Sequence, residues 1–88
     1  MGIPKTNARR RYLVTFHVKA EWKDGAGVVH DLANHYVERL GHDADSVYNS
    51  AALEFPGCIS KVYPDTEYNR KRLAAFRTTL IDITGARR

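Results

Sequence analysis

The strongest constraint on the fold is an alternation of apolar and polar residues that runs through residues 12–22. The apolar row is Tyr12, Val14, Phe16, Val18, Ala20 and Trp22. The row between them is more polar and consists of Leu13, Thr15, His17, Lys19 and Glu21. Because side chains of a β-strand point alternately to two faces, this pattern predicts one long strand. We expect its apolar row to be packed and its other row to be wetter.

The spacing of apolar residues changes after the glycine-containing segment 23–27. From Val28 they recur at helical spacing along one stripe, formed by Val29, Leu32, Ala33, Tyr36, Val37 and Leu40. Gly41 follows, and glycine is the residue type that most often ends a helix. These observations predict a helix over residues 28–40.

A second helix is predicted from Thr66 to Arg77. Thr66 can cap the first turn, and Glu67 places an acid near the positive end of the helix dipole. Leu73 and Phe76 have the spacing of residues that face a core. This helix is therefore expected to lie against the sheet.

Three further segments are predicted to be strands. Residues 47–55 alternate, although a short helix capped by Ser46 is an alternative that the pattern leaves open. Pro and Gly in the turn 55–58 have the order of a type II turn, so residues 58–63 are expected to fold back as a hairpin partner. The β-branched residues of 78–84 favour a final strand over a continuation of the second helix.

The resulting order β-α-β-β-α-β predicts an α+β fold of the ferredoxin-like type. Right-handed crossovers would give an antiparallel sheet of strand order 4-1-3-2 with both helices on one face. A chain of 88 residues with 43% apolar residues supports one such domain. We place this domain at residues 11–85, after a flexible basic arm at 1–10 and before a basic tail at 86–88.

Charge is segregated along the chain, although the net charge is only +4. Residues 1–11 carry four bases and no acid, 12–66 carry four bases and eight acids, and 67–88 carry six bases and two acids. In the predicted topology the basic ends meet at one end of the sheet. The resulting anion-binding patch is expected to contain Arg9, Arg10, Arg11, Arg70, Lys71, Arg72, Arg77, Arg87 and Arg88.

The sequence offers little support for catalysis or for a cofactor. The histidines and aspartates between 30 and 45 include Asp31 and His35, which would be neighbours on the predicted helix, but a solvated contact is the favoured interpretation. Small ferredoxin-like nucleases hold a metal with acids at the end of the first strand, and residues 16–19 contain no acid. The single cysteine, Cys58, rules out an internal disulfide and is expected to be buried and structural. No metal site, cofactor or catalytic residue is predicted.

These observations favour a small, basic, non-enzymatic domain that binds RNA or DNA phosphates. The main alternative is a regulator or inhibitor that binds an acidic protein surface, such as an antitoxin, an immunity protein or a phage-encoded antagonist of a nuclease complex. A weak metal-dependent nuclease is a third option. A homodimer formed through the sheet is left open. With one cysteine and no apolar run of about 18 residues, we expect a cytoplasmic protein that does not enter a membrane.

Overall fold

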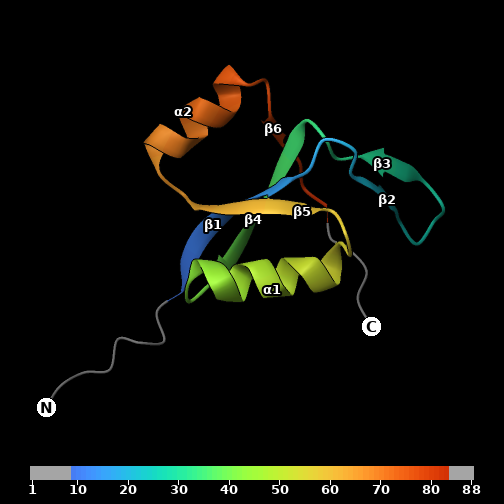
Figure 1. Ribbon diagram of the computed structural model, residues 1–88, viewed down its shortest axis with the longest axis horizontal. Coiled ribbons are helices and arrows are strands. Elements are labelled where there is room, and N and C mark those ends of the chain that lie inside the picture. Colours follow the sequence, from blue (N-terminus) through green and yellow to red (C-terminus); the bar gives the residue numbers. More distant parts are fainter. Residues whose placement is uncertain (1–8, 84–88) are drawn as a thin grey trace, which may run out of the picture.

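The computed structural model describes residues 9–83, which form a four-stranded sheet, a two-stranded hairpin and two helices (Figure 1). The strands are β1 (Arg10–Phe16), β2 (Glu21–Lys23), β3 (Val29–Asp31), β4 (His35–Gly41), β5 (Ile59–Pro64) and β6 (Thr79–Leu80). The helices are α1 (Ala44–Glu54) and α2 (Glu67–Ala75). The predicted tail at 86–88 and most of the predicted arm lie outside the described residues.

The four-stranded sheet is mixed and has the order β5-β1-β4-β6. β1 is antiparallel to both β4 and β5, whereas β4 and β6 are parallel. The α+β class with two helices is therefore confirmed, but the prediction of a purely antiparallel sheet was wrong. The ferredoxin-like strand order 4-1-3-2 is not found either.

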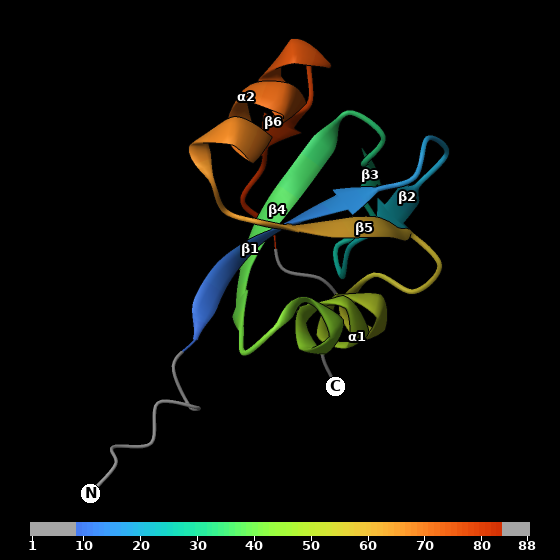
Figure 2. The same ribbon diagram turned by 60° about the vertical axis from the view of Figure 1, so that its left-hand side comes forward.

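The two helices lie on opposite sides of the sheet, not on one face as predicted (Figures 1 and 2). The connection β4-α1-β5 passes over β1 in one direction, and β5-α2-β6 returns across the sheet in the other. Crossovers between parallel strands keep one hand, so a reversal of direction moves the helix to the other face. The central strands are consequently covered on both sides.

Coverage on both sides explains why residues 28–40 were wrongly predicted to be helical. Tyr36 and Val37 are adjacent in β4 and point to opposite faces, yet both are buried, with 6% and 0% of their surface exposed. A strand buried on both faces does not alternate, and its apolar pairs imitate a helical stripe. The same effect buries Leu13, which the alternation had placed on the wetter face.

The segment before β4 forms the hairpin β2-β3. Its loop is closed by Asp24, whose Oδ1 accepts hydrogen bonds from the backbone N of Ala26 and of Val28, each at 2.9 Å. Gly27 donates to the backbone O of Asp24 and has φ +88°. A turn followed by a left-handed glycine is a common three-residue hairpin loop. The first predicted strand therefore ends at Phe16, and Trp22 belongs to the hairpin.

The segment predicted as the strand 47–55 belongs instead to α1, so the alternative interpretation as a short helix is confirmed. The cap is not Ser46, as that alternative has it, but Asp43, whose Oδ1 accepts from the backbone N of Ser46 at 2.8 Å. Val47 and Ala51, one helical turn apart, are buried against the sheet. Gly41 permits this approach, since a Cβ at that position would lie 2.4 Å from Cγ2 of Val47.

The main core lies between α1 and the sheet, and it contains the first part of the predicted apolar row. Tyr12, Val14 and Phe16 are buried there. Phe55 is fully buried and makes edge-to-face contacts with Phe16 and Trp22, with ring centroids 5.2 Å and 5.4 Å apart. The remaining members of this cluster are Ala20, Leu32, Val37, Val47, Ala51 and Cys58.

The C-terminal elements follow the prediction only in part. Thr66 caps α2 by accepting from the backbone N of Asn69 at 3.1 Å, as expected. Phe76, however, is 70% exposed and does not face the core. The final strand is β6 alone, and it pairs with β4, not with the first strand.

Candidate functional site

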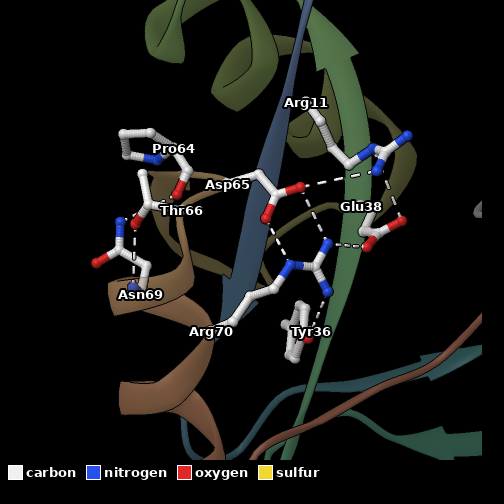
Figure 3. Close-up of polar contacts among 8 residues, drawn as sticks. All are labelled: Arg11, Tyr36, Glu38, Pro64, Asp65, Thr66, Asn69 and Arg70. Carbon is white, nitrogen blue, oxygen red and sulfur yellow. Dashed lines mark hydrogen bonds and ion pairs between the residues drawn. The ribbon is translucent and has the colours of Figure 1, made fainter.

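The structure brings together part of the predicted basic patch. Arg11 in β1 and Arg70 in α2 approach the same two carboxylates, those of Glu38 and Asp65 (Figure 3). The backbone N of Asp65 donates to the O of Arg11 at 3.2 Å, which fixes the start of α2 beside β1. Arg87 and Arg88, which were predicted to join the patch, lie outside the described residues.

Arg70 is occupied by contacts within the domain. Its Nε donates to Oδ1 of Asp65 at 2.5 Å and its Nη2 to Oδ2 at 3.0 Å, which makes a bidentate pair. Nη2 also donates to Oε2 of Glu38, and Nη1 lies 3.5 Å from the hydroxyl of Tyr36. The hydrogen bond from Arg70 lowers the pKa of Asp65, and that pairing in turn raises the pKa of Arg70.

This ion-pair network attaches α2 to the sheet. Glu38 in β4 and Tyr63 in β5 are both register partners of Leu13, which is fully buried. None of the residues of α2 itself is buried, so Arg70 makes its principal polar attachment to the sheet. We therefore assign Arg70 a structural role and exclude it from the candidate site.

Other basic residues are paired in a similar way. Arg39 donates to both carboxylate oxygens of Glu54 at 2.8 Å, and Lys71 lies 3.2 Å from Glu67. Arg39 also borders an open groove of about 430 Å³ lined by Arg9, Arg11, Glu38, Arg39 and Leu40. Four basic side chains therefore have a carboxylate nearby, namely those of Arg11, Arg39, Arg70 and Lys71.

The domain is thus less basic than the whole chain. Residues 9–83 contain eleven of the 14 Lys and Arg residues, because Lys5, Arg87 and Arg88 lie outside, and all 10 acids. The excess of positive charge therefore lies mainly outside residues 9–83, and within this range individual side chains are the better guide to a binding surface.

Such side chains lie along the outer side of α2. Tyr68 and Phe76 are 67% and 70% exposed, and Arg72 lies between them with its guanidinium carbon 5.8 Å from the centroid of the Tyr68 ring. The spacing i, i+4 and i+8 places the three on one side of the helix. Two exposed rings and a cation form a row about 12 Å long at 1.5 Å per residue.

A small pocket adjoins this row, between α2 and β5. It has a volume of about 50 Å³ and is lined by Tyr63, Asn69, Arg72 and Leu73. Arg72 belongs both to the row and to the pocket, so the two are continuous. We call the combined set the α2–β5 surface, defined as Tyr63, Tyr68, Asn69, Arg72, Leu73 and Phe76.

Arg77 follows this surface in an unusual backbone conformation. Its φ is +60°, in the left-handed region that usually selects glycine. Its backbone N donates to the O of Ala74 at 2.9 Å, and that of Thr78 donates to the O of Leu73 at 2.8 Å. This pair of bonds is the Schellman pattern that ends a helix. An arginine at this glycine-favouring position is exposed at the end of the α2–β5 surface.

The patch predicted from the sequence includes Arg72 of this surface and Arg77 beside it, but neither of the two exposed aromatic residues. Phe76 is instead predicted to face the core, because its spacing from Leu73 fits a buried stripe. The four-residue spacing of Tyr68, Arg72 and Phe76 places them on one side of the helix, but it does not show that this side is exposed. Lys71 lies apart from the row, paired with Glu67.

The residues considered as metal ligands do not form a cluster. Asp31 and His35 belong to different strands, so the helical pairing predicted for them was wrong. Asp24, not Asp31, contacts a histidine, with Oδ2 at 2.9 Å from Nε2 of His30, and this bond lowers the pKa of Asp24. Across residues 9–83 no three His, Cys, Asp or Glu side chains are grouped so that they could hold a metal ion.

Cys58 is buried, as predicted, and burial raises the pKa of its thiol. A thiol with a raised pKa is a poor nucleophile at neutral pH. Neither helix in the described part of the chain is long and apolar enough to cross a membrane.

No protein-family model, curated protein or solved structure matches this chain. Its function therefore has to be inferred from its own residues.

Proposed function

We propose that this protein is a non-enzymatic domain that binds single-stranded nucleic acid through the α2–β5 surface. The observation that carries the proposal is the exposed row Tyr68, Arg72 and Phe76. Exposed aromatic rings interleaved with a cation are the usual means of binding unpaired bases and their phosphates. Because stacking needs an accessible base face, single strands should bind better than duplexes.

The row also suits a strand in its dimensions. Tyr68 and Phe76 are separated by about 12 Å along the helix, which leaves room for Arg72 to contact a phosphate between two stacked bases. Arg77 extends the same path beyond the end of α2. Arg9 and Arg10, which are exposed at the start of β1, are available for additional phosphate contacts.

The first test measures the binding of fluorescent single-stranded RNA and DNA of about 12 nucleotides, a length within the range of small single-strand sites. The double variant Tyr68→Ala with Phe76→Ala should bind at least about tenfold more weakly, because each base stack contributes about 1–3 kcal/mol. The matched control removes two exposed apolar side chains from α1, with Tyr48→Ala and Leu53→Ala. Equal loss in both variants, or no binding by the wild type at low salt, contradicts the proposal.

The salt dependence gives a second readout of the same proposal. Since Arg70, Arg11 and Arg39 are paired with carboxylates, few phosphates should be neutralised. The slope of log K against log salt, measured between about 50 and 200 mM, should lie near −0.7 for each phosphate contacted, and hence between about −1 and −3. A much steeper slope would mean that more phosphates are neutralised, and it would favour the larger arginine patch that the sequence predicts.

A protein-binding regulator is the second candidate, favoured by a different region. Val18, Val28 and Val29 in and before the hairpin β2-β3 are 81%, 54% and 55% exposed. Exposed apolar side chains on a projecting hairpin are typical of protein contacts. A partner that is retained by the wild type and lost with Val29→Thr, while Tyr68→Ala has no effect, would favour this function.

A homodimer formed through the sheet is not part of the proposal. The outer edge of β5 carries the exposed residues Lys61 and Pro64, and its pairing with β1 is interrupted between Val14 and Phe16. Lysine, proline and irregular pairing are features that protect edge strands from joining another sheet.

A further inference from the structure

We infer that the pocket between α2 and β5 receives the edge of one base and prefers bases that carry an exocyclic amino group, cytosine and adenine over uracil and thymine. This inference rests on the proposed function, because it names the base preference of the same surface. It is carried by the pocket's size, by its continuity with Arg72 and by the orientation of Asn69.

The pocket is small but has room for several atoms of a ligand. Its volume is about 50 Å³, and a cavity needs about 10–15 Å³ on the same measure to hold one water molecule. An amino group with the adjacent ring atoms is the part of a base that we expect to enter it. Since Arg72 lines the pocket and also lies over Tyr68, a base whose edge enters it would leave its face towards the row.

The amide of Asn69 is held in one orientation. Its Nδ2 donates to the backbone O of Pro64 at 3.0 Å, while its backbone N donates to Oγ1 of Thr66. Figure 3 shows the amide oxygen turned away from both partners. Within residues 9–83 no group donates a hydrogen bond to this oxygen. Asn69 lines the pocket, and this oxygen is the acceptor that its side chain has left for a ligand.

A fixed acceptor distinguishes bases by their exocyclic groups. The N4 amino group of cytosine and the N6 amino group of adenine donate, whereas O4 of uracil and thymine accepts and would face Oδ1 of Asn69 unfavourably. Each of these bases also presents acceptors to which Arg72 can donate, namely ring nitrogens in cytosine and adenine and carbonyl oxygens in uracil and thymine. The discrimination therefore comes from Asn69, and Arg72 contributes to the binding of all of them.

The test compares two pyrimidine oligonucleotides, oligo-C and oligo-U, at about neutral pH, where cytosine is unprotonated. The wild type should bind oligo-C about fivefold more tightly, the effect of one neutral hydrogen bond gained against an unfavourable contact. Asn69→Leu should bring the affinity for oligo-C down to that for oligo-U. The matched control Asn49→Leu changes an exposed asparagine of α1 and should keep the preference.

A chemical change in the ligand removes any dependence on the folding of the variant. An oligo-C that carries N4,N4-dimethylcytosine has no amino hydrogen to donate, so the wild type should bind it no better than oligo-U. Equal binding of oligo-C and oligo-U, or tight binding of the dimethylated strand, overturns the inference but leaves the proposed function standing. Failure to bind any of the three strands overturns both.

Discussion

The two helices of this domain begin in the same way and are held in opposite ways. Each is capped by a side-chain oxygen that accepts from the backbone N three residues later, Asp43 for α1 and Thr66 for α2. Beyond the cap, α1 buries Val47 and Ala51 in the core, whereas α2 buries none of its residues and is attached through Arg70. We conclude that α1 stabilises the fold, while α2 is attached mainly by polar contacts and leaves the rings of Tyr68 and Phe76 exposed.

The largest difference between the two helices is expected when one phenylalanine is removed from the end of each. Phe55, at the end of α1, is fully buried, whereas Phe76, at the end of α2, is 70% exposed. Phe55→Ala should lower the free energy of unfolding by about 3–5 kcal/mol, because it leaves a cavity between aromatic neighbours. Phe76→Ala should change it by less than about 0.5 kcal/mol. Urea unfolding followed by far-ultraviolet circular dichroism measures both.

The total stability of small domains limits this experiment. A domain of this size has about 5–10 kcal/mol of stability, so Phe55→Ala can leave too little folded protein to measure. Phe55→Leu is then the milder variant, with the same direction of change. A comparable loss in Phe76→Ala would mean that Phe76 is buried in solution, for example against a second copy. The loss would then depend on protein concentration.

The next effect concerns the attachment of α2. Arg70→Met keeps an unbranched apolar stem but leaves Asp65 and Glu38 without their main partner. Arg11, at 3.7 Å and 4.0 Å from these carboxylates, compensates only in part. We expect a loss of about 1–2 kcal/mol, less than for a fully buried pair, because about a third of the Arg70 side chain is exposed to screening solvent.

Hydrogen exchange would show where this loss occurs. Amides of α2 should exchange faster in Arg70→Met, while those of α1 keep their protection, because α2 has little else to hold it. The matched control is Lys71→Met, which removes an exposed pair with Glu67 worth about 0.3–0.5 kcal/mol. If both variants lose the same amount, or if α1 loses protection as well, Arg70 does not act as the attachment of α2.

The same contrast explains which elements the sequence could predict. Thr66 and the residues after it were sufficient for α2, because an exposed helix depends on local capping and propensity. The type II turn at Pro56 and Gly57 was also found: Gly57 has φ +75° and Cys58 donates to the O of Phe55. It joins α1 to β5, however, and not two strands.

Buried elements were harder to predict, since their pattern depends on what covers them. β4 lost its alternation because Tyr36 and Val37 face two covered sides. The strand predicted at 47–55 failed because its alternating residues equally fit a helix that buries Val47 and Ala51 one turn apart. The first ambiguity can be resolved only by knowing that α2 covers the far side of the sheet, and the second only by knowing that residues 44–54 pack on the sheet as a helix.

The candidate site divides along the same line. Positive charge identified Arg70 and Arg72 alike, because charge in a sequence does not show which carboxylates will lie nearby. Asp65 is close to Arg70 in the chain, in the connection between β5 and α2. Glu38 lies in β4, and only the fold brings it to Arg70. Exposure of Tyr68 and Phe76 was equally beyond the sequence, because an aromatic residue in a helix is usually buried.

A smaller change in stability is expected at Arg77, the residue that ends α2. Arg77 has a left-handed backbone, where a non-glycine residue is strained by about 1–2 kcal/mol. Glycine at this position would relieve the strain, but part of that stabilisation is offset by the larger conformational entropy that glycine loses on folding. Arg77→Gly should therefore raise the free energy of unfolding by about 0.5–1 kcal/mol. It should also remove one phosphate contact, which reduces the salt slope of oligonucleotide binding by about 0.7.

Arg77→Ala is the matched control, since it loses the charge and keeps the strain. Arg77→Ala should lower the salt slope as much as Arg77→Gly does, but it should not raise the free energy of unfolding. The difference in stability between the two variants then measures the backbone strain, and their common change in salt slope measures the effect of the lost charge. If Arg77→Gly is no more stable than Arg77→Ala, residue 77 does not have the left-handed backbone conformation that ends α2. If neither variant changes the salt slope, Arg77 lies outside the binding surface, and its strained position has no connection with binding.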